Sequence, residues 1–160
     1  MKKCRNCGAT DSLSSTREAR PLDSLPAVIV HRLKVTRCAA CGAESVSIPR
    51  LEELHEVVAK ALVQRPGRLA GPEVRYLRKW MGWSGRDFAE KFELTPEHVS
   101  RVENGHHPIS AVADKLLRVL VLTRTPTPEY SPEDVLTTRS ESVPFSLGVA
   151  GADERWQAVA

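Results

Sequence analysis

The chain has 160 residues, which is enough for one mid-sized domain or two small ones. Aromatic residues make up only 5% of the chain and prolines number 11, which argues against one large core. The net charge of +3 excludes a strongly basic protein, and the lack of both an apolar run and a signal-peptide core predicts a cytoplasmic protein that makes no membrane contact.

The first 48 residues contain all four cysteines. Each pair, Cys4 with Cys7 and Cys38 with Cys41, is a CxxC sequence followed by glycine, and the run AVIVHRLKVTRC between them alternates roughly as a strand does. Two intervening residues let one tight turn direct both sulfurs at a single ion, and zinc takes four ligands in a tetrahedron. We therefore predict that residues 1–48 form a small β domain held by one structural Zn²⁺ on these four cysteines.

Other uses of the cysteines fit the pattern less well. Disulfides are rare in cytosolic chains, and a redox CxxC is normally single and begins a helix. A catalytic zinc needs an open coordination position, which a fourth cysteine would fill. His31, in the predicted strand, could replace one sulfur, but a half-exposed strand histidine is the simpler interpretation.

Residues 49–71 are predicted to connect two domains. The run RLEELHEVVAKALVQ places apolar residues on one helical stripe, with Glu and Lys opposite, as in an amphipathic helix. Proline and glycine breaks in RPGRLAGP then end this helix. The expected stripe consists of Leu51, Leu54, Val58, Ala61 and Leu62.

Residues 72–124 are predicted to form a compact set of short helices. Ser84, Thr95 and Ser110 are suited to cap three of them, and Pro72 is suited to the first position of another. Helices this short are not stable alone and must share a core. The candidate core residues are Val74, Leu77, Phe88, Ala89, Phe92, Leu94, Val99, Val102, Leu116, Leu117 and Leu120.

The last segment, residues 125–160, differs from the rest in charge and composition. It carries 2 basic and 6 acidic residues, whereas residues 65–106 carry 8 basic and 6 acidic ones. Its four prolines and scattered apolar residues predict a disordered or weakly docked tail. Only a local surface of the protein is basic enough to bind phosphates.

The stretch SGRDFAEKFELTPEHVSRVENG has the spacing of a helix-turn-helix. Ala89 is small enough for the helix crossing, Val99 and Val102 would attach the second helix to the core, and Glu93 begins the turn. Arg101 then faces outward, where its guanidinium can bind O6 and N7 of guanine. Glu97, Arg101 and His98 are the predicted base-reading residues.

Other polar positions of this stretch are predicted to contact the DNA backbone. Such contacts position a protein without reading sequence, and they favour helix N-termini. The candidates are Ser84, Arg86, Thr95, Pro96, Ser100 and Asn104. A small helical bundle with a solvated polar face would show the same periodicity, so the pattern alone leaves both interpretations open.

A resemblance to known families favours DNA binding. Residues 72–124, with SRVENG at positions 100–105, resemble the Cro and phage-repressor type of helix-turn-helix. Two CxxC pairs about thirty residues apart, a short connector and this helix-turn-helix together resemble MqsA-type antitoxins, also called YgiT-type zinc-finger proteins. The resemblance covers residues 1–124.

This resemblance implies a bacterial repressor whose C-terminal domain dimerises and binds a palindromic operator in double-stranded DNA. It implies that the four cysteines bind structural zinc, that Arg101 reads bases, and that Ser84 caps the first helix of the motif. In true antitoxins of the family, the zinc domain also neutralises an mRNA-cleaving toxin. The chain departs from relatives at Gly85, where many have glutamine, and at Glu93, where glycine is frequent.

The sequence therefore predicts an α+β protein that is not an enzyme. A Cys4 zinc-binding β domain (1–48) is followed by a connecting helix and linker (49–71), an all-α helix-turn-helix domain (72–124) and a disordered tail (125–160). The predicted function is a homodimeric, sequence-specific transcriptional regulator that represses its own operon. The alternative is an antitoxin whose zinc domain also binds a toxin.

Overall fold

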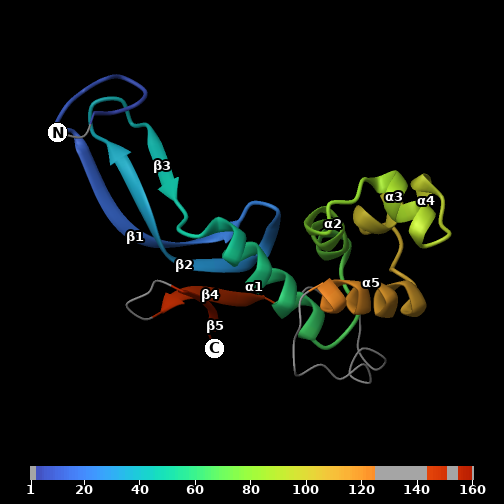
Figure 1. Ribbon diagram of the computed structural model, residues 1–160. Helices are drawn as coiled ribbons and strands as arrows, with labels where there is room; N and C mark the ends of the chain where they lie inside the picture. Colours follow the sequence, from blue (N-terminus) through green and yellow to red (C-terminus); the bar gives the residue numbers. More distant parts are fainter. Residues whose placement is uncertain (1–2, 125–143, 151–154, 160) are drawn as a thin grey trace.

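The computed structural model describes residues 3–124, 144–150 and 155–159. In Figure 1, a long arm of β-strands extends from a β-sheet, and a group of helices lies on the other side of the molecule. Helix α1 (Leu51–Gln64) runs between the two regions. The predicted α+β class is confirmed, with the β region first in the chain.

The sheet is built on one long hairpin. Strands β1 (Leu13–Leu22) and β2 (Leu25–Cys38) pair antiparallel along their whole length. The other edge of β2 is shared by two partners: β3 (Glu44–Ser47) pairs with its C-terminal half, and β4 (Phe145–Ala150) runs parallel to its N-terminal half. Strand β5 (Arg155–Val159) then pairs antiparallel with β4.

A β-bulge divides the hairpin between these two partners. Glu18 pairs with Leu33 but Arg20 pairs with Val30, so β2 contains one extra residue at this point. Arg32 accommodates the bulge with a φ of 61°. The hairpin bends there (Figure 1). We call the part beyond the bulge, residues 3–18 and 33–47, the arm.

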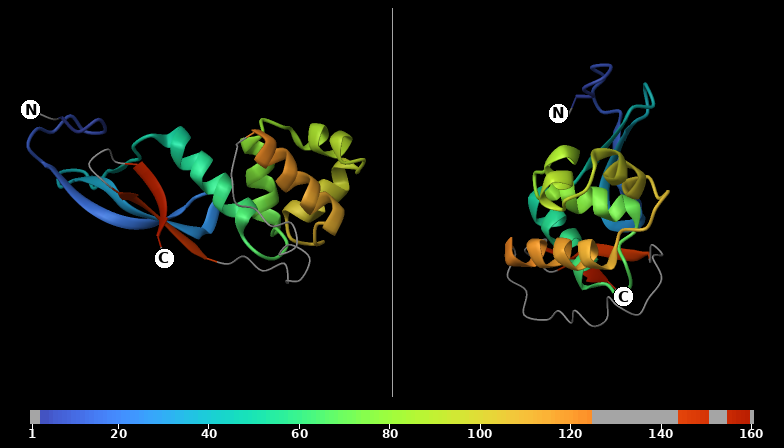
Figure 2. Two further views of the ribbon diagram at one scale, coloured as in Figure 1. Left: turned by 60° about the horizontal axis from the view of Figure 1, so that its bottom comes forward. Right: turned by 90° about the vertical axis from the view of Figure 1, so that its right-hand side faces the viewer.

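The C-terminal strands correct one prediction. The tail was expected to be disordered or weakly docked, but β4 and β5 extend the sheet beside the base of the hairpin (Figure 2). Leu147, Val149 and Trp156 are buried there, and the Trp156 indole N–H donates to the carbonyl oxygen of Pro49 at 2.8 Å. Five- and six-residue strands are stable only on an existing edge, which the sequence of the tail does not reveal. The rest of the predicted tail, chiefly residues 125–143, lies outside the described residues.

Helix α1 packs one face against the sheet and the other elements of the core. Its buried face agrees with the predicted stripe at three positions, but Leu51 is 48% exposed and Ala61 is only half-buried. The buried residues are Leu54, Val58, Ala59, Leu62 and Val63. They belong to one hydrophobic cluster that runs from the sheet through α1 into the helical region.

Four further helices complete the fold: α2 (Gly71–Trp80), α3 (Gly85–Lys91), α4 (Pro96–Glu103) and α5 (Ala111–Arg124). The predicted core residues found buried are Val74, Leu77, Phe88, Ala89, Val99, Val102 and Leu117. Phe92, Leu94 and Leu120 are half-buried. The prediction for Leu116 is wrong, because this side chain is 39% exposed.

The orientation of α5 explains the error at Leu116. Asp114 and Arg118, one turn apart, are both completely buried and form an ion pair in which Arg118 Nε donates to Asp114 Oδ2 at 2.9 Å. Because these polar residues occupy the inner face of α5, Leu116 lies on its outer face. Apolar periodicity alone would have placed the polar pair in solvent.

The buried pair holds the segment that joins α1 to α2. Arg118 donates to the carbonyl oxygens of Val63 at 2.8 Å and Arg65 at 2.7 Å, and also to that of Gly67. Asp114 accepts the backbone N–H of Leu69 at 2.7 Å. The connector predicted from RPGRLAGP is therefore fixed to α5 by charge-assisted hydrogen bonds rather than left as a free linker. Among the described helices, none has the length and hydropathy needed to cross a bilayer.

Candidate nucleic-acid interface and metal centre

The two CxxC turns at the tip of the arm have the same backbone geometry. The N–H of Gly8 donates to the carbonyl of Cys4 at 2.9 Å, and the N–H of Gly42 donates to that of Cys38 at 2.8 Å. Gly8 and Gly42 have φ values of 75° and 72°, so each turn ends in the left-handed conformation that glycine adopts without strain. The two turns therefore present their cysteines in equivalent ways.

The turns bring all four sulfurs together. Cys4 Sγ lies 3.7 Å from Cys41 Sγ, Cys7 Sγ lies 3.7 Å from Cys38 Sγ, and the four sulfurs lie within 4.8 Å of one another. Sulfurs bound tetrahedrally at the Zn–S distance of about 2.3 Å would lie about 3.8 Å apart. These separations are far longer than a disulfide bond of about 2.0 Å, and all four cysteines are free.

Neighbouring polar groups stabilise two of the thiolates. The hydroxyl of Ser12, 3.4 Å from the sulfur, is the main cause that lowers the pKa of Cys38 to about 6. The amide of Asn6 donates to Cys41 Sγ at 3.5 Å and is the main cause of a lowered pKa there. The deprotonated form that binds metal is thus favoured at both positions.

Cys7 behaves differently. The backbone N–H of Ala9 acts to lower the pKa of its thiol, but hydrogen bonding with the other thiols outweighs this and raises the pKa to about 12. Four thiolates at these separations need a cation between them. The donor set and its spacing are compatible with a structural zinc site and leave no open position for catalysis.

The predicted caps of the helical domain are confirmed. Ser84 Oγ accepts the backbone N–H of Asp87 at 3.1 Å, and Thr95 Oγ1 accepts that of His98 at 3.2 Å. Ser110 caps α5 in the same way. Each cap satisfies an N–H that would otherwise lack a partner in the first turn, and each fixes where its helix begins.

Helices α3 and α4 cross as a helix-turn-helix requires. Ala89 is buried at the crossing, and Val99 and Val102 are buried beneath α4, as predicted. The N–H of Leu94 donates to the carbonyl of Ala89 at 2.8 Å, which closes the turn between the two helices. Residues on the opposite side of α4 therefore face solvent.

Helices α2, α3 and α4 end in the same hydrogen-bonded motif. The residue after each C-cap has a positive φ: 78° at Gly82, 53° at Glu93 and 76° at Gly105. Its N–H and the next one bond back into the last turn, which is a Schellman motif. The left-handed backbone at Glu93, where relatives frequently have glycine, costs about 1–2 kcal/mol relative to glycine.

The outward face of α4 carries the predicted DNA contacts. Pro96, Glu97, Ser100 and Arg101 are exposed, and Arg86 is exposed on α3. Within the described part of the chain, no acidic side chain forms an ion pair with Arg101. Its guanidinium is consequently available to a ligand.

Two other predicted contact residues are engaged within the protein. His98 is half-buried, and its ring stacks on that of His107 with the centroids 6.1 Å apart. The Asn104 amide donates to the Ser100 carbonyl at 2.8 Å and accepts from Arg75 at 2.8 Å. DNA contact by His98 or Asn104 therefore stays a prediction, and it would compete with these interactions.

Sequence reasoning missed the buried carboxylate of Glu103, which fixes the end of α4. Glu103 is 7% exposed; it accepts from Arg75 Nε at 3.1 Å and forms two hydrogen bonds with Arg78, one of them 3.0 Å long. In the polar run SRVENG it looked like a solvent-facing residue. The nearby basic residues of α2 were the only available sign that it had a partner.

Glycine at the start of α2 allows this helix to approach the end of α4 closely. A Cβ at Gly71 would lie 2.3 Å from the carbonyl oxygen of Val102 and 2.8 Å from that of Glu103. No side chain fits there, so the N-terminus of α2 lies directly against the C-terminus of α4. The position and orientation of α4 are thus set by α2.

Comparisons with known proteins identify the helical region. Residues 74–120 match a family model described as helix-turn-helix, HTH_3, which indicates a helix-turn-helix domain of the Cro/C1 type in this segment. No curated protein and no solved structure matches the chain.

Proposed function

Because residues 74–120 form a helix-turn-helix domain, we propose that this protein is a sequence-specific transcriptional regulator that represses its own operon. In this proposal, α4 enters the major groove of double-stranded DNA, and Arg101 reads guanine. Glu97 and His98 add base contacts, and the residues at the starts of α3 and α4 contact phosphates. The observation that carries the proposal is the exposed guanidinium of Arg101 on the outer face of α4, with no ion-pair partner among the described residues.

The proposal is tested by separating the charge of Arg101 from its shape. A binding site is first selected from random DNA with the wild-type protein. Arg101→Ala and Arg101→Lys are then titrated against the selected site and against random DNA. A bidentate arginine contributes about 1–3 kcal/mol of discrimination, so both variants should lose roughly 5- to 150-fold of the preference for the selected site. Lysine keeps the charge but not the planar fork.

The two variants should differ on random DNA. Arg101→Lys should retain binding there, because non-specific affinity depends on charge. If both variants keep the wild-type preference for the selected site, while circular dichroism shows an unchanged fold, then Arg101 does not read bases.

We further propose that two copies bind a palindromic operator, with α5 at the dimer interface. Val112, Leu116 and Val119 form an apolar stripe on the outer side of α5 and are 77%, 39% and 46% exposed. This spacing places all three on one face of the helix. An apolar stripe on a helix whose other face is already buried favours a protein partner, and a two-fold DNA site favours a second copy.

Leu116→Glu tests this interface. Sedimentation analysis should show that the wild type is a dimer and that the variant is a monomer, because a charge in the centre of the stripe would lose its water on association. Lys115→Glu, one residue away, is the matched control and should remain a dimer. A wild-type protein that sediments as a monomer at all concentrations would contradict the proposed dimer.

A structural Zn²⁺ is part of the proposal. Cys4, Cys7, Cys38 and Cys41 would hold it, and the ion would supply folding free energy to the arm without contacting DNA. The alternative function is that of an antitoxin whose arm also binds an mRNA-cleaving toxin. It is supported by the exposed strand β3, which among the described strands pairs only with β2. If the neighbouring gene encodes a ribonuclease, co-expression should abolish its toxicity; continued toxicity would exclude this role.

A further inference from the structure

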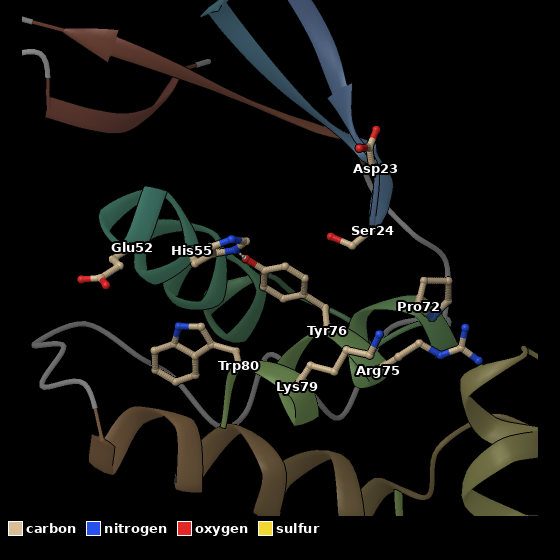
Figure 3. Close-up of a pocket in the computed structure, with 9 residues that line it drawn as sticks. All are labelled: Asp23, Ser24, Glu52, His55, Pro72, Arg75, Tyr76, Lys79 and Trp80. Carbon is tan, nitrogen blue, oxygen red and sulfur yellow. Dashed lines mark hydrogen bonds between the residues drawn. The ribbon is translucent and has the colours of Figure 1, made fainter. Parts of the chain in front are cut away.

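A cavity of about 590 Å³ lies between the helical domain and the sheet. It is bounded by the turn joining β1 to β2, by α1 and by the outer side of α2 (Figure 3). Its volume is in the range of small-molecule sites, which span about 300–1,000 Å³. None of the residues proposed to bind DNA or zinc lines it.

Helix α2 gives the cavity two parallel stripes of different chemistry. Tyr76 and Trp80, four residues apart, form an aromatic stripe (Figure 3). The hydroxyl of Tyr76 is hydrogen-bonded to His55 Nδ1 at 2.6 Å, so the polar end of this side chain already has a partner. Arg75 and Lys79, also four residues apart, form a cationic stripe beside the aromatic one.

The opposite side of the cavity is acidic and polar. Asp23 and Ser24 lie in the β1–β2 turn across from Lys79, with the Ser24 hydroxyl directed toward the cavity and the Asp23 carboxylate toward the strands, and Glu52 lies at the edge formed by α1 (Figure 3). The carboxylates of Asp23 and Glu52 accept hydrogen bonds and repel anions, whereas the Ser24 hydroxyl can donate or accept a hydrogen bond. Within the described residues, Lys79 forms no ion pair with them or with any other carboxylate.

We propose that this cavity binds a small aromatic monocarboxylate that carries a hydroxyl or amino group, and that this ligand modulates DNA binding. The ring would lie on the Tyr76–Trp80 stripe, and the carboxylate would pair with Lys79 and Arg75. The hydroxyl or amino group would donate to the acidic side. A second carboxylate on the ligand would face Asp23 or Glu52 and be rejected.

Arg75 connects the cavity to the recognition helix. Besides lining the cavity, it donates to Glu103 at 3.1 Å and to Asn104 at 2.8 Å, at the C-terminal end of α4. A ligand carboxylate would compete for the same guanidinium. Because Gly71 holds α2 in direct contact with the end of α4, a shift of α2 would also move α4. The effect on DNA rests on the proposed function, whereas ligand binding does not.

The binding test uses 4-hydroxybenzoate as the probe and needs no DNA. Calorimetry of the full-length, zinc-loaded protein should give a Kd of about 1 mM or tighter, as expected for a ligand of this size. Terephthalate replaces the hydroxyl with a second carboxylate, and methyl 4-hydroxybenzoate removes the charge. Both should bind at least about tenfold more weakly, because one faces the acidic side and the other loses the ion pair.

Two variants locate the site. Lys79→Met keeps an unbranched side chain but removes the charge, and it should weaken 4-hydroxybenzoate binding about tenfold. Lys34→Met removes an exposed lysine of the arm and should leave binding unchanged. Absence of binding by the wild type, equal binding of all three compounds, or equal affinity of the Lys79→Met variant would each overturn the proposed site.

The effect of the ligand on DNA binding is measured separately, as the affinity for the selected DNA with and without saturating 4-hydroxybenzoate. A change of threefold or more in the DNA affinity of the wild type, absent in Lys79→Met, would support regulation through this cavity. An unchanged DNA affinity together with measured ligand binding would overturn only the regulatory part. Failure to bind any DNA would instead contradict the proposed function and leave the binding result standing.

Discussion

The arm and the helical domain are stabilised in different ways. Among the residues of the CxxC turns and β3, only Cys4 and Cys38 are buried, and all of β3 is exposed. The helical domain buries Phe88, Leu77, Leu117 and many smaller apolar residues, together with internal ion pairs. Beyond Leu33 and Val35 the arm buries little apolar surface, so we expect its fold to depend mainly on its four sulfurs, whereas the helices rely on a packed core.

The largest expected effect is the loss of the arm's stability on removal of the metal, with little change in the helical domain. Structural zinc contributes about 10–16 kcal/mol in small zinc domains, so chelation or Cys38→Ser should unfold the arm. Hydrogen exchange should show lost protection in residues 33–47 and retained protection in α2–α5. Ser45→Ala, an exposed change on β3, is the control and should keep the zinc-loaded pattern. An arm that stays protected without metal would show that zinc is not its source of stability.

The second largest effect is expected where α5 meets the α1–α2 segment. Arg118→Met would leave Asp114 buried without its cation and three carbonyl groups without their donor. Losing one partner of a buried pair costs about 3–5 kcal/mol, measurable by urea unfolding of the zinc-loaded protein. Arg86→Met removes an exposed arginine of α3 and should change stability by less than about 0.5 kcal/mol. Equal stability of the two variants would mean that the buried pair does not hold the junction.

The smallest expected effect is a gain in the stability of the helical domain alone. Glu93 has a φ of 53° at a position where the equivalent ends of α2 and α4 use glycine. Glu93→Gly should raise the free energy of unfolding by about 1 kcal/mol, because strain at this position exceeds the added freedom of the unfolded chain. Glu90→Gly, within α3, is the contrasting control and should lose about 1 kcal/mol. A destabilised Glu93→Gly variant would show that the backbone there is not strained.

Local signals predicted much of the site. The CxxC pairs indicated the cysteine cluster because turn geometry fixes where neighbouring sulfurs point. Ser84 and Thr95 indicated the helix starts because a cap bonds within its own turn. The C-terminal strands were missed because β4 and β5 depend on the edge of β2, more than a hundred residues away in the chain. Leu116 was misplaced because the buried Asp114–Arg118 pair overrides apolar periodicity.

By itself, the sequence determined the features that depend on neighbours along the chain: the cysteine turns, the caps and the outward position of Arg101. Tertiary structure alone decided which distant groups meet. It placed Glu103 against Arg75 and Arg78, Arg118 against the carbonyls before α2, and Asp23 across a cavity from Lys79. Turns and helix caps depend on residues that are consecutive in the chain. Buried ion pairs and cavities form only once separate elements have packed together.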